Sequence, residues 1–75
     1  MKLEEILGRI LEISPLELGD HSSQQTLPSW SSFAHINIIL ALESSYGVSF
    51  TTKEIQLGKS IGEIRQLLRN KGAEI

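Results

Sequence analysis

The stretch from Trp30 to Gly47 contains the signals for the start, the body and the end of one helix. Ser31 and Ser32 form a serine pair, and serine is common at a helix start because its hydroxyl accepts a hydrogen bond from a free backbone N–H. Gly47 suits the left-handed conformation that often follows a helix. We therefore predict a helix that begins at Ser31 or Ser32 and ends before Gly47. The apolar residues at helical spacing, which we expect on its inner face, are Phe33, Ile36, Ile39, Leu40 and Leu42.

A first helix and a long loop are predicted to precede this stretch. The helix runs from about Lys2 to Ile13, because Pro15 disfavours helical geometry at Ser14. Its inner residues at helical spacing are Leu3, Ile6, Leu7, Ile10 and Leu11. Residues 14–31 are rich in Ser, Gln, Gly and Pro, which is typical of a loop. We expect this loop to be ordered, since it carries four large apolar anchors, Leu16, Leu18, Leu27 and Trp30.

Two short sequence patterns predict the remaining helices. Thr51–Glu54 and Ser60–Glu63 each place a hydroxyl three residues before a glutamate, which is the pattern of a capping box. The first box opens a short helix that Gly58 stops. The second opens a helix with an inner face made of Ile61, Ile64, Leu67 and Leu68. The basic residues near its end, expected to be solvated and to favour the helix dipole, are Arg65, Arg69 and Lys71. The chain is thus predicted to be one all-α domain over residues 1–75.

Composition excludes several classes of function. The chain has 75 residues, close to the lower limit for a self-sufficient core, and so has little material to line a substrate pocket. Its net charge of −2 argues against nucleic-acid binding, which relies on phosphate neutralisation. It has no cysteine, no apolar run that could span a membrane and no secretory signal. We expect a monomeric, cytoplasmic protein that is not an enzyme and has no metal site.

The chain resembles the acyl carrier proteins. The segment from Ala41 to Phe50 is similar to the family's Ala-Leu-Glu-Glu-Glu-Phe-Gly-Ile-Glu-Ile, and the register places Ser31, Ser32 and Phe33 on the family's Asp-Ser-Leu triplet. Trp30 and the segment 35–37 resemble a subgroup that reads Trp-Asp-Ser-Leu-Gly-His-hydrophobic-Asn, and the segment 60–64 resembles the start of the family's last helix. The resemblance implies a four-helix bundle with a long first loop and a short third helix.

The resemblance also implies a site and a function. Ser32 would carry a 4'-phosphopantetheine arm, attached from coenzyme A by a phosphopantetheinyl transferase. The arm would hold acyl intermediates as thioesters for acyl-loading and acyl-transferring enzymes of fatty-acid, polyketide or other pathways. A helix start favours the phosphodiester electrostatically. The inner face, expected to include Ile10, Ile36, Leu40 and Ile64, could shelter an aliphatic chain. The residues expected to contact the arm or a partner are Trp30, Ser31, Phe33, His35 and Ile36.

Two departures from the family pattern leave a second hypothesis. Ser31 stands where the family has an aspartate that is thought to help hold magnesium, so the chain could instead be an unmodified interaction module with the carrier fold. The second helix also lacks the family's acidic face: Glu43 is its only acid. The positions expected to face solvent are Ala34, His35, Asn37, Ser44 and Ser45. Taken without the register, Ser32 could be only a helix cap. A peptidyl carrier is a third, related option, but the two glycines that usually stand shortly before the modified serine in that class are absent from this chain.

Overall fold

The computed structural model describes residues 3–73, which form four α-helices and one short 3-10 helix. The elements are α1 (Leu3–Leu11), η1 (Pro15–Glu17), α2 (Ser32–Tyr46), α3 (Thr52–Leu57) and α4 (Ile61–Asn70). Within the described residues the only strand-like feature is an isolated bridge between Ser23 and Ser60. The order of elements, with a long first loop and a very short third helix, confirms the all-α prediction. No helix in this part of the chain is long and apolar enough to cross a membrane.

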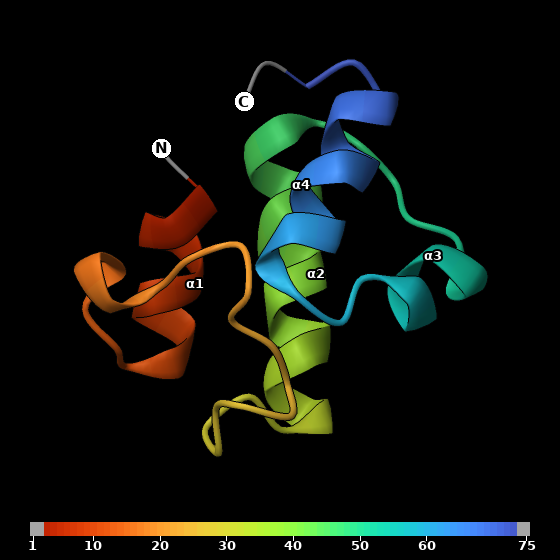
Figure 1. Ribbon diagram of the computed structural model, residues 1–75. Coiled ribbons are helices and arrows are strands. Elements are labelled where there is room, and N and C mark those ends of the chain that lie inside the picture. Colours follow the sequence, from red (N-terminus) through yellow and green to blue (C-terminus); the bar gives the residue numbers. More distant parts are fainter. Residues whose placement is uncertain (1–2, 74–75) are drawn as a thin grey trace.

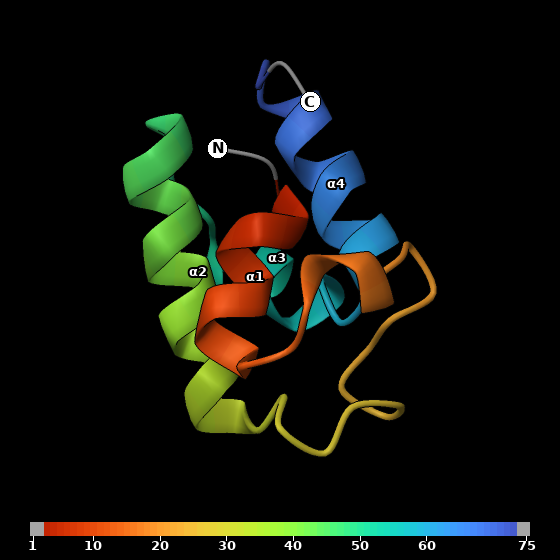
Figure 2. The same cartoon turned by 90° about the vertical axis from the view of Figure 1, so that its left-hand side faces the viewer.

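Three of the helices enclose the core. α1 and α2 run in opposite directions, and α4 runs in the same direction as α2 (Figure 1). α3 lies on the side of the molecule away from α1, as the turned view also shows (Figure 2). The largest side chains that are fully buried come from α1, α2 and α4, and they are Leu3, Leu7, Ile38, Leu42, Ile61, Ile64 and Leu68. The start of α2 lies at one end of the bundle, next to the last part of the long loop (Figure 1).

α1 ends earlier than the sequence indicated. The predicted end was Ile13, whereas the helix stops at Leu11 and Glu12 takes a left-handed φ of 59°. The backbone N–H of Ile13 then donates to the Gly8 carbonyl at 3.0 Å, the long-range bond of a Schellman turn. Gly8 permits this turn, because a Cβ there would lie 2.7 Å from the Ile13 oxygen. The predicted start at Lys2 lies outside the described residues.

The long loop is ordered, as predicted, but partly for another reason. Trp30 is 2% exposed and anchors the loop, and Leu18 and Leu27 pack against the core. Leu16 was expected to be an anchor, but it is 96% exposed on η1, so that prediction was wrong. Backbone pairing supplies the rest of the order: the N–H groups of Gln24, Ile61 and Gly62 donate to carbonyls of Lys59, Ser22 and Asp20. These backbone hydrogen bonds join the loop to the segment between α3 and α4 and to the start of α4.

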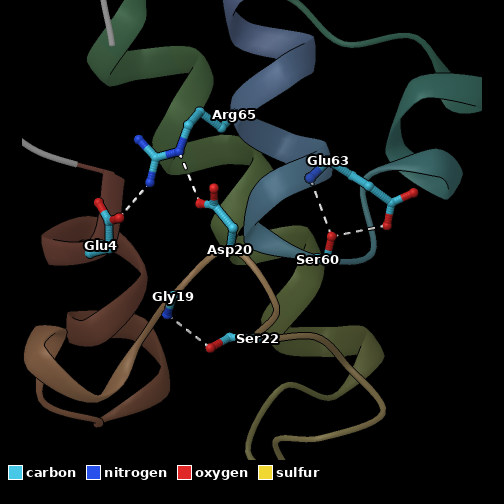
Figure 3. A network of polar contacts seen from close by, with 7 residues as sticks. All are labelled: Glu4, Gly19, Asp20, Ser22, Ser60, Glu63 and Arg65. Carbon is cyan, nitrogen blue, oxygen red and sulfur yellow. Dashed lines mark hydrogen bonds and ion pairs between the residues drawn. The ribbon is translucent and has the colours of Figure 1, made fainter.

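An ion-pair cluster ties α1, the loop and α4 together. The Arg65 guanidinium contacts the Glu4 carboxylate of α1, and its Nε lies 3.1 Å from Asp20 Oδ1 in the loop (Figure 3). Arg65 was predicted to be part of a solvated helix end, which was wrong. Lys71, predicted the same way, instead pairs with Glu54 of α3 at 2.8 Å. These basic side chains therefore join helices.

The two predicted capping boxes differ in detail. The box at Thr51 and Glu54 is complete, with both reciprocal bonds present. At Ser60, the hydroxyl accepts from the Glu63 N–H, but the Glu63 carboxylate accepts from that same hydroxyl and not from the Ser60 backbone (Figure 3). Gly47 has the predicted left-handed φ, of 65°. Gly58 ends α3, and a side chain there would crowd Ile64 and Leu67 of α4.

The rotation of α2 was predicted wrongly. Phe33, Ile36 and Leu40 were expected inside, but they are 78%, 49% and 58% exposed. Ala34 and His35 were expected in solvent but are buried. The residues of α2 that are buried are Ala34, His35, Ile38, Ile39 and Leu42, so only Ile39 and Leu42 of the predicted face are correct. Apolar residues surround this helix, so spacing alone cannot select the face. The packing of the other helices selects it.

Candidate functional site

Ser31 and Ser32 have separate roles at the start of α2. Ser31 is the N-cap: its backbone is extended and its hydroxyl accepts from the Ala34 N–H at 3.1 Å. Ser32 is the first helical residue and is exposed. No described residue makes a hydrogen bond to the Ser32 hydroxyl. Since Ser31 supplies the cap, Ser32 is not needed for it, and its hydroxyl is free to react at the end of the bundle.

A shallow groove of about 460 Å³ runs beside Ser32 between α2 and α3. The loop, both helices and the segment after α3 contribute to it, and its other lining residues are Gln24, His35, Ile36, Ile55, Gln56 and Lys59. Lys59 is exposed and carries the only full charge among them. Two amide side chains and one ammonium group give the groove polar surface, and Ile36 and Ile55 give it apolar surface. Gln24, Gln56 and Lys59 were not identified from the sequence, because no motif or spacing links them to Ser32.

Three groups close the floor of this groove by hydrogen bonds. The indole Nε1–H of Trp30 donates to Nδ1 of His35 at 3.1 Å, and His35 Nε2 lies 2.8 Å from the carbonyl oxygen of Ile55 on α3. Trp30 and His35 are 2% and 7% exposed. His35 was predicted to lie at the surface, so that prediction was wrong. Trp30 is a loop anchor, and its burial leaves little of the indole for an arm or a partner to touch.

The exposed apolar residues of α2 form a stripe next to the free serine. Phe33, Ile36 and Leu40 follow helical spacing along one line that begins beside Ser32. The first turn of α2 has no acidic residue. Glu43, the one acid of the helix, uses its carboxylate to accept from the Phe50 backbone N–H at 2.8 Å. The surface around Ser32 is therefore apolar and not acidic.

These residues fit a phosphodiester on Ser32. The first backbone N–H groups of a helix have no partner within the helix, and the dipole places partial positive charge there. Lys59 adds a cation on the groove wall. The residues are also compatible with a flexible arm, because the hydroxyl faces solvent. No group of three or more side chains in residues 3–73 is arranged to hold a metal ion.

The fold can be compared with a solved structure. The solution NMR structure of a holo acyl carrier protein from Nitrosomonas europaea is similar to this chain with a TM-score of 0.79. The two sequences are 27% identical, and the match covers 92% of this chain and 89% of that one. The chain has the acyl carrier protein fold. No protein-family model and no curated protein sequence matches it.

The comparison bears on the function at a coarse level. It supports an acyl carrier role. Carrier proteins are not enzymes, which agrees with the prediction that this chain has no catalytic activity of its own. Similarity to the subgroup with a tryptophan before the triplet stays a prediction, as does the role of each site residue.

Proposed function

We propose that the chain is an acyl carrier protein that bears a 4'-phosphopantetheine arm on Ser32. The observation that carries this proposal is that the two serines have different roles. Ser31 caps α2, whereas the next residue, Ser32, is exposed, and no described residue makes a hydrogen bond to its hydroxyl. The similarity to a protein described as a holo acyl carrier protein supports it. When bound, the arm supplies a thiol that holds acyl groups as thioesters. Ser32 attaches it, and the start of α2 and Lys59 offset the phosphodiester charge.

The experiment is direct modification. We expect incubation with a broad-specificity phosphopantetheinyl transferase, magnesium and coenzyme A to raise the intact mass by one arm. Peptide mapping should locate it on Ser32, and Ser32→Ala should abolish it. Ser44→Ala is the matched control, because Ser44 is an equally exposed serine of the same helix outside the family register. Modification that survives in Ser32→Ala would show that the register is wrong.

The alternative is an interaction module that keeps the fold and is never modified. Ser31 in place of the family's aspartate is the specific observation that favours it. This alternative predicts that the chain isolated from its native host has the unmodified mass. It also predicts that a transferase from that host fails to modify Ser32 under the conditions above. A modified native chain would exclude it.

The proposed partners are the transferase and enzymes that load or transfer acyl groups. We propose that these enzymes bind an apolar surface of this chain. The stripe of Phe33, Ile36 and Leu40 lies beside Ser32, where any enzyme acting on the arm must approach. Apolar contacts depend weakly on ionic strength, whereas charge-steered association weakens steeply with salt. We therefore expect the modification rate to change less than about threefold between 50 mM and 500 mM salt.

A substitution tests the same surface. Phe33→Ser should lower kcat/KM for modification by about tenfold, since a buried aromatic contact is worth on the order of 1–2 kcal/mol at an interface. Leu16→Ser is the control, because Leu16 is also a largely exposed apolar residue but lies on η1 and not on α2. Equal effects of the two substitutions, or a steep loss of rate with salt, would contradict an apolar docking surface. The acyl cargo, the pathway, monomeric state and cytoplasmic location stay predictions.

A further inference from the structure

The hydrogen bonds between Trp30, His35 and Ile55 fix the chemical state of the imidazole. An indole N–H can only donate, so Nδ1 of His35 must be the acceptor of the 3.1 Å bond. A backbone carbonyl can only accept, so Nε2 must carry the proton that it shares with Ile55 at 2.8 Å. Both ring nitrogens are thus satisfied by the neutral ring with its proton on Nε2. The ring joins the loop and α2 to α3.

This chain of bonds lies between Ser32 and the core. In the groove beside Ser32, His35 is the most buried lining residue, and Ile55 packs against the core from α3. Further along α2, Ile38 and Leu42 are both fully buried. A chain that entered the core from the groove would have to separate α2 from α3 at His35. That separation would break the bond between His35 and the partly buried Ile55 carbonyl, and it would disturb the buried bond from the indole N–H, whose loss without a new partner is costly.

We propose that Trp30, His35 and the Ile55 carbonyl form a lock that keeps aliphatic acyl groups out of the core. The proposal rests on the proposed carrier function and deepens it, because it makes His35 the residue that decides where the cargo resides. With the lock closed, the acyl group stays outside the bundle, along the groove or in solvent. Such a carrier has no preference of its own for long chains, and short or polar acyl groups are held as well as aliphatic ones.

A second route into the bundle is a separate possibility that the test must detect. A smaller cleft of about 210 Å³ lies between α1 and α2, lined by Ile6, Arg9, Ile10, Ala41 and Ser45. It does not include Ser32 or any residue of the lock. An aliphatic chain that reached the core through this cleft would be sheltered despite the lock. Because the lock is proposed to decide where the cargo resides, shelter through this cleft in the natural sequence would count against the proposal.

The first measurement needs no arm and so does not depend on the proposed function. Nitrogen-15 NMR of the imidazole in the unmodified protein at pH 7.5 should show His35 as the neutral form protonated on Nε2. In Trp30→Phe, which removes the indole N–H together with the five-membered part of the ring, the signal of Nδ1 should move while Nε2 stays protonated. A His35 ring protonated on Nδ1, or a Nδ1 signal that Trp30→Phe leaves unchanged, would overturn the lock.

The second measurement asks whether chain length matters. Ser32 is loaded from acetyl-coenzyme A or octanoyl-coenzyme A by a transferase, and intact mass confirms loading before the rate of thioester cleavage by hydroxylamine is measured. Failure to load counts against the proposed function, whereas a loaded protein tests the lock. In the natural sequence the two thioesters should be cleaved at rates that agree within about twofold, after correction by the matching free acyl-pantetheine thioesters. An octanoyl thioester protected more than fivefold would overturn the lock.

Variants separate a lock from general packing. His35→Ala removes both bonds and opens space below Ser32, so octanoyl protection of at least fivefold should appear. Trp30→Phe should give a smaller gain in the same direction. Leu7→Val is the control, because Leu7 is a fully buried residue of α1 that lines neither the groove nor the smaller cleft, and it should give no protection. Equal protection in Leu7→Val and His35→Ala would also overturn the proposal.

Discussion

The observed rotation of α2 makes a sharp prediction about two isoleucines of the same helix. Ile38 is fully buried, whereas Ile36, two positions earlier, is 49% exposed. Ile→Ala removes the same atoms at both positions and changes helix propensity equally. The sequence pattern favoured Ile36 as the inner residue. A comparison of Ile36→Ala with Ile38→Ala therefore tests the face that α2 presents to solvent and, with it, the proposed docking stripe.

The expected magnitudes follow from burial. Truncation of a fully buried isoleucine costs about 2–5 kcal/mol, because the transfer term and the cavity term add. At Ile36 half of the side chain already contacts water and no cavity forms, so the loss is at most about 1 kcal/mol, partly offset by the better helix propensity of alanine. A domain of 75 residues has a free energy of unfolding of about 4–11 kcal/mol. Ile38→Ala thus removes a large share of that stability.

The assay is unfolding followed by circular dichroism at 222 nm, with urea and with heat. A change of 1 kcal/mol moves Tm by roughly 4–8 °C in a domain of this size. Ile38→Ala should lower Tm by about 10 °C or more, and Ile36→Ala by no more than about 5 °C. If Ile38→Ala is too unstable to measure, Ile38→Val should still cost about 0.5–1.5 kcal/mol and Ile36→Val less than about 0.5 kcal/mol. A larger loss at position 36 in either pair would refute the observed rotation.

Two further predictions concern charge at helix ends. Ser31→Asp should raise the modification rate of Ser32, since a carboxylate beside the hydroxyl gives magnesium the oxygen ligand that it prefers. The same substitution should stabilise α2 by roughly 0.3–1 kcal/mol. The modification rates of the two proteins are measured with one transferase at matched concentrations, and equal rates would show that metal recruitment is not limiting. The hydrogen bonds that Glu54 accepts from Lys71 and from the Thr51 backbone lower the pKa of its carboxyl. The stability that this carboxylate contributes is therefore complete above its unfolded pKa of about 4.3 and is lost as pH falls through the lower folded pKa. The difference between the urea midpoints of the natural sequence and of Glu54→Gln should be largest at pH 7 and should shrink as the pH falls below about 4.3, and a difference that does not shrink with acidification would contradict the role of this ion pair.

Local signals in the sequence were enough to locate the helices. A helix start needs one hydroxyl next to a free N–H, and Thr51 supplies it within four residues of chain. Gly47 likewise ends α2 through its own backbone conformation. The end of α1 could not be located by local signals alone. The sequence indicated that Pro15 ends this helix. The actual end at Leu11 depends on the close approach of Ile13 to Gly8, which only the folded turn reveals.

Contacts between distant parts of the chain could not be predicted in the same way. The pairing of Arg65 with Glu4 joins residues from opposite ends of the sequence, and a basic residue near a helix end gives no sign of such a partner. The face of α2 belongs to the same class, because leucines and isoleucines surround the helix and the packing of the other elements decides which of them are covered. Ser32 was found by register, but the groove beside it was not, since Gln24 and Lys59 come from separate segments.

The inward position of His35 and the outward position of Phe33 are two results of one rotation. Turning α2 so that Phe33 faced the core would carry His35 to the surface and break both of its hydrogen bonds. The bonds from Trp30 and to Ile55 therefore help to hold the rotation that exposes Phe33, Ile36 and Leu40. A substitution that opens the proposed lock should thus also change how partners meet the stripe. For that reason, the modification rate of His35→Ala must be compared with that of Trp30→Phe before any loss is assigned to docking alone.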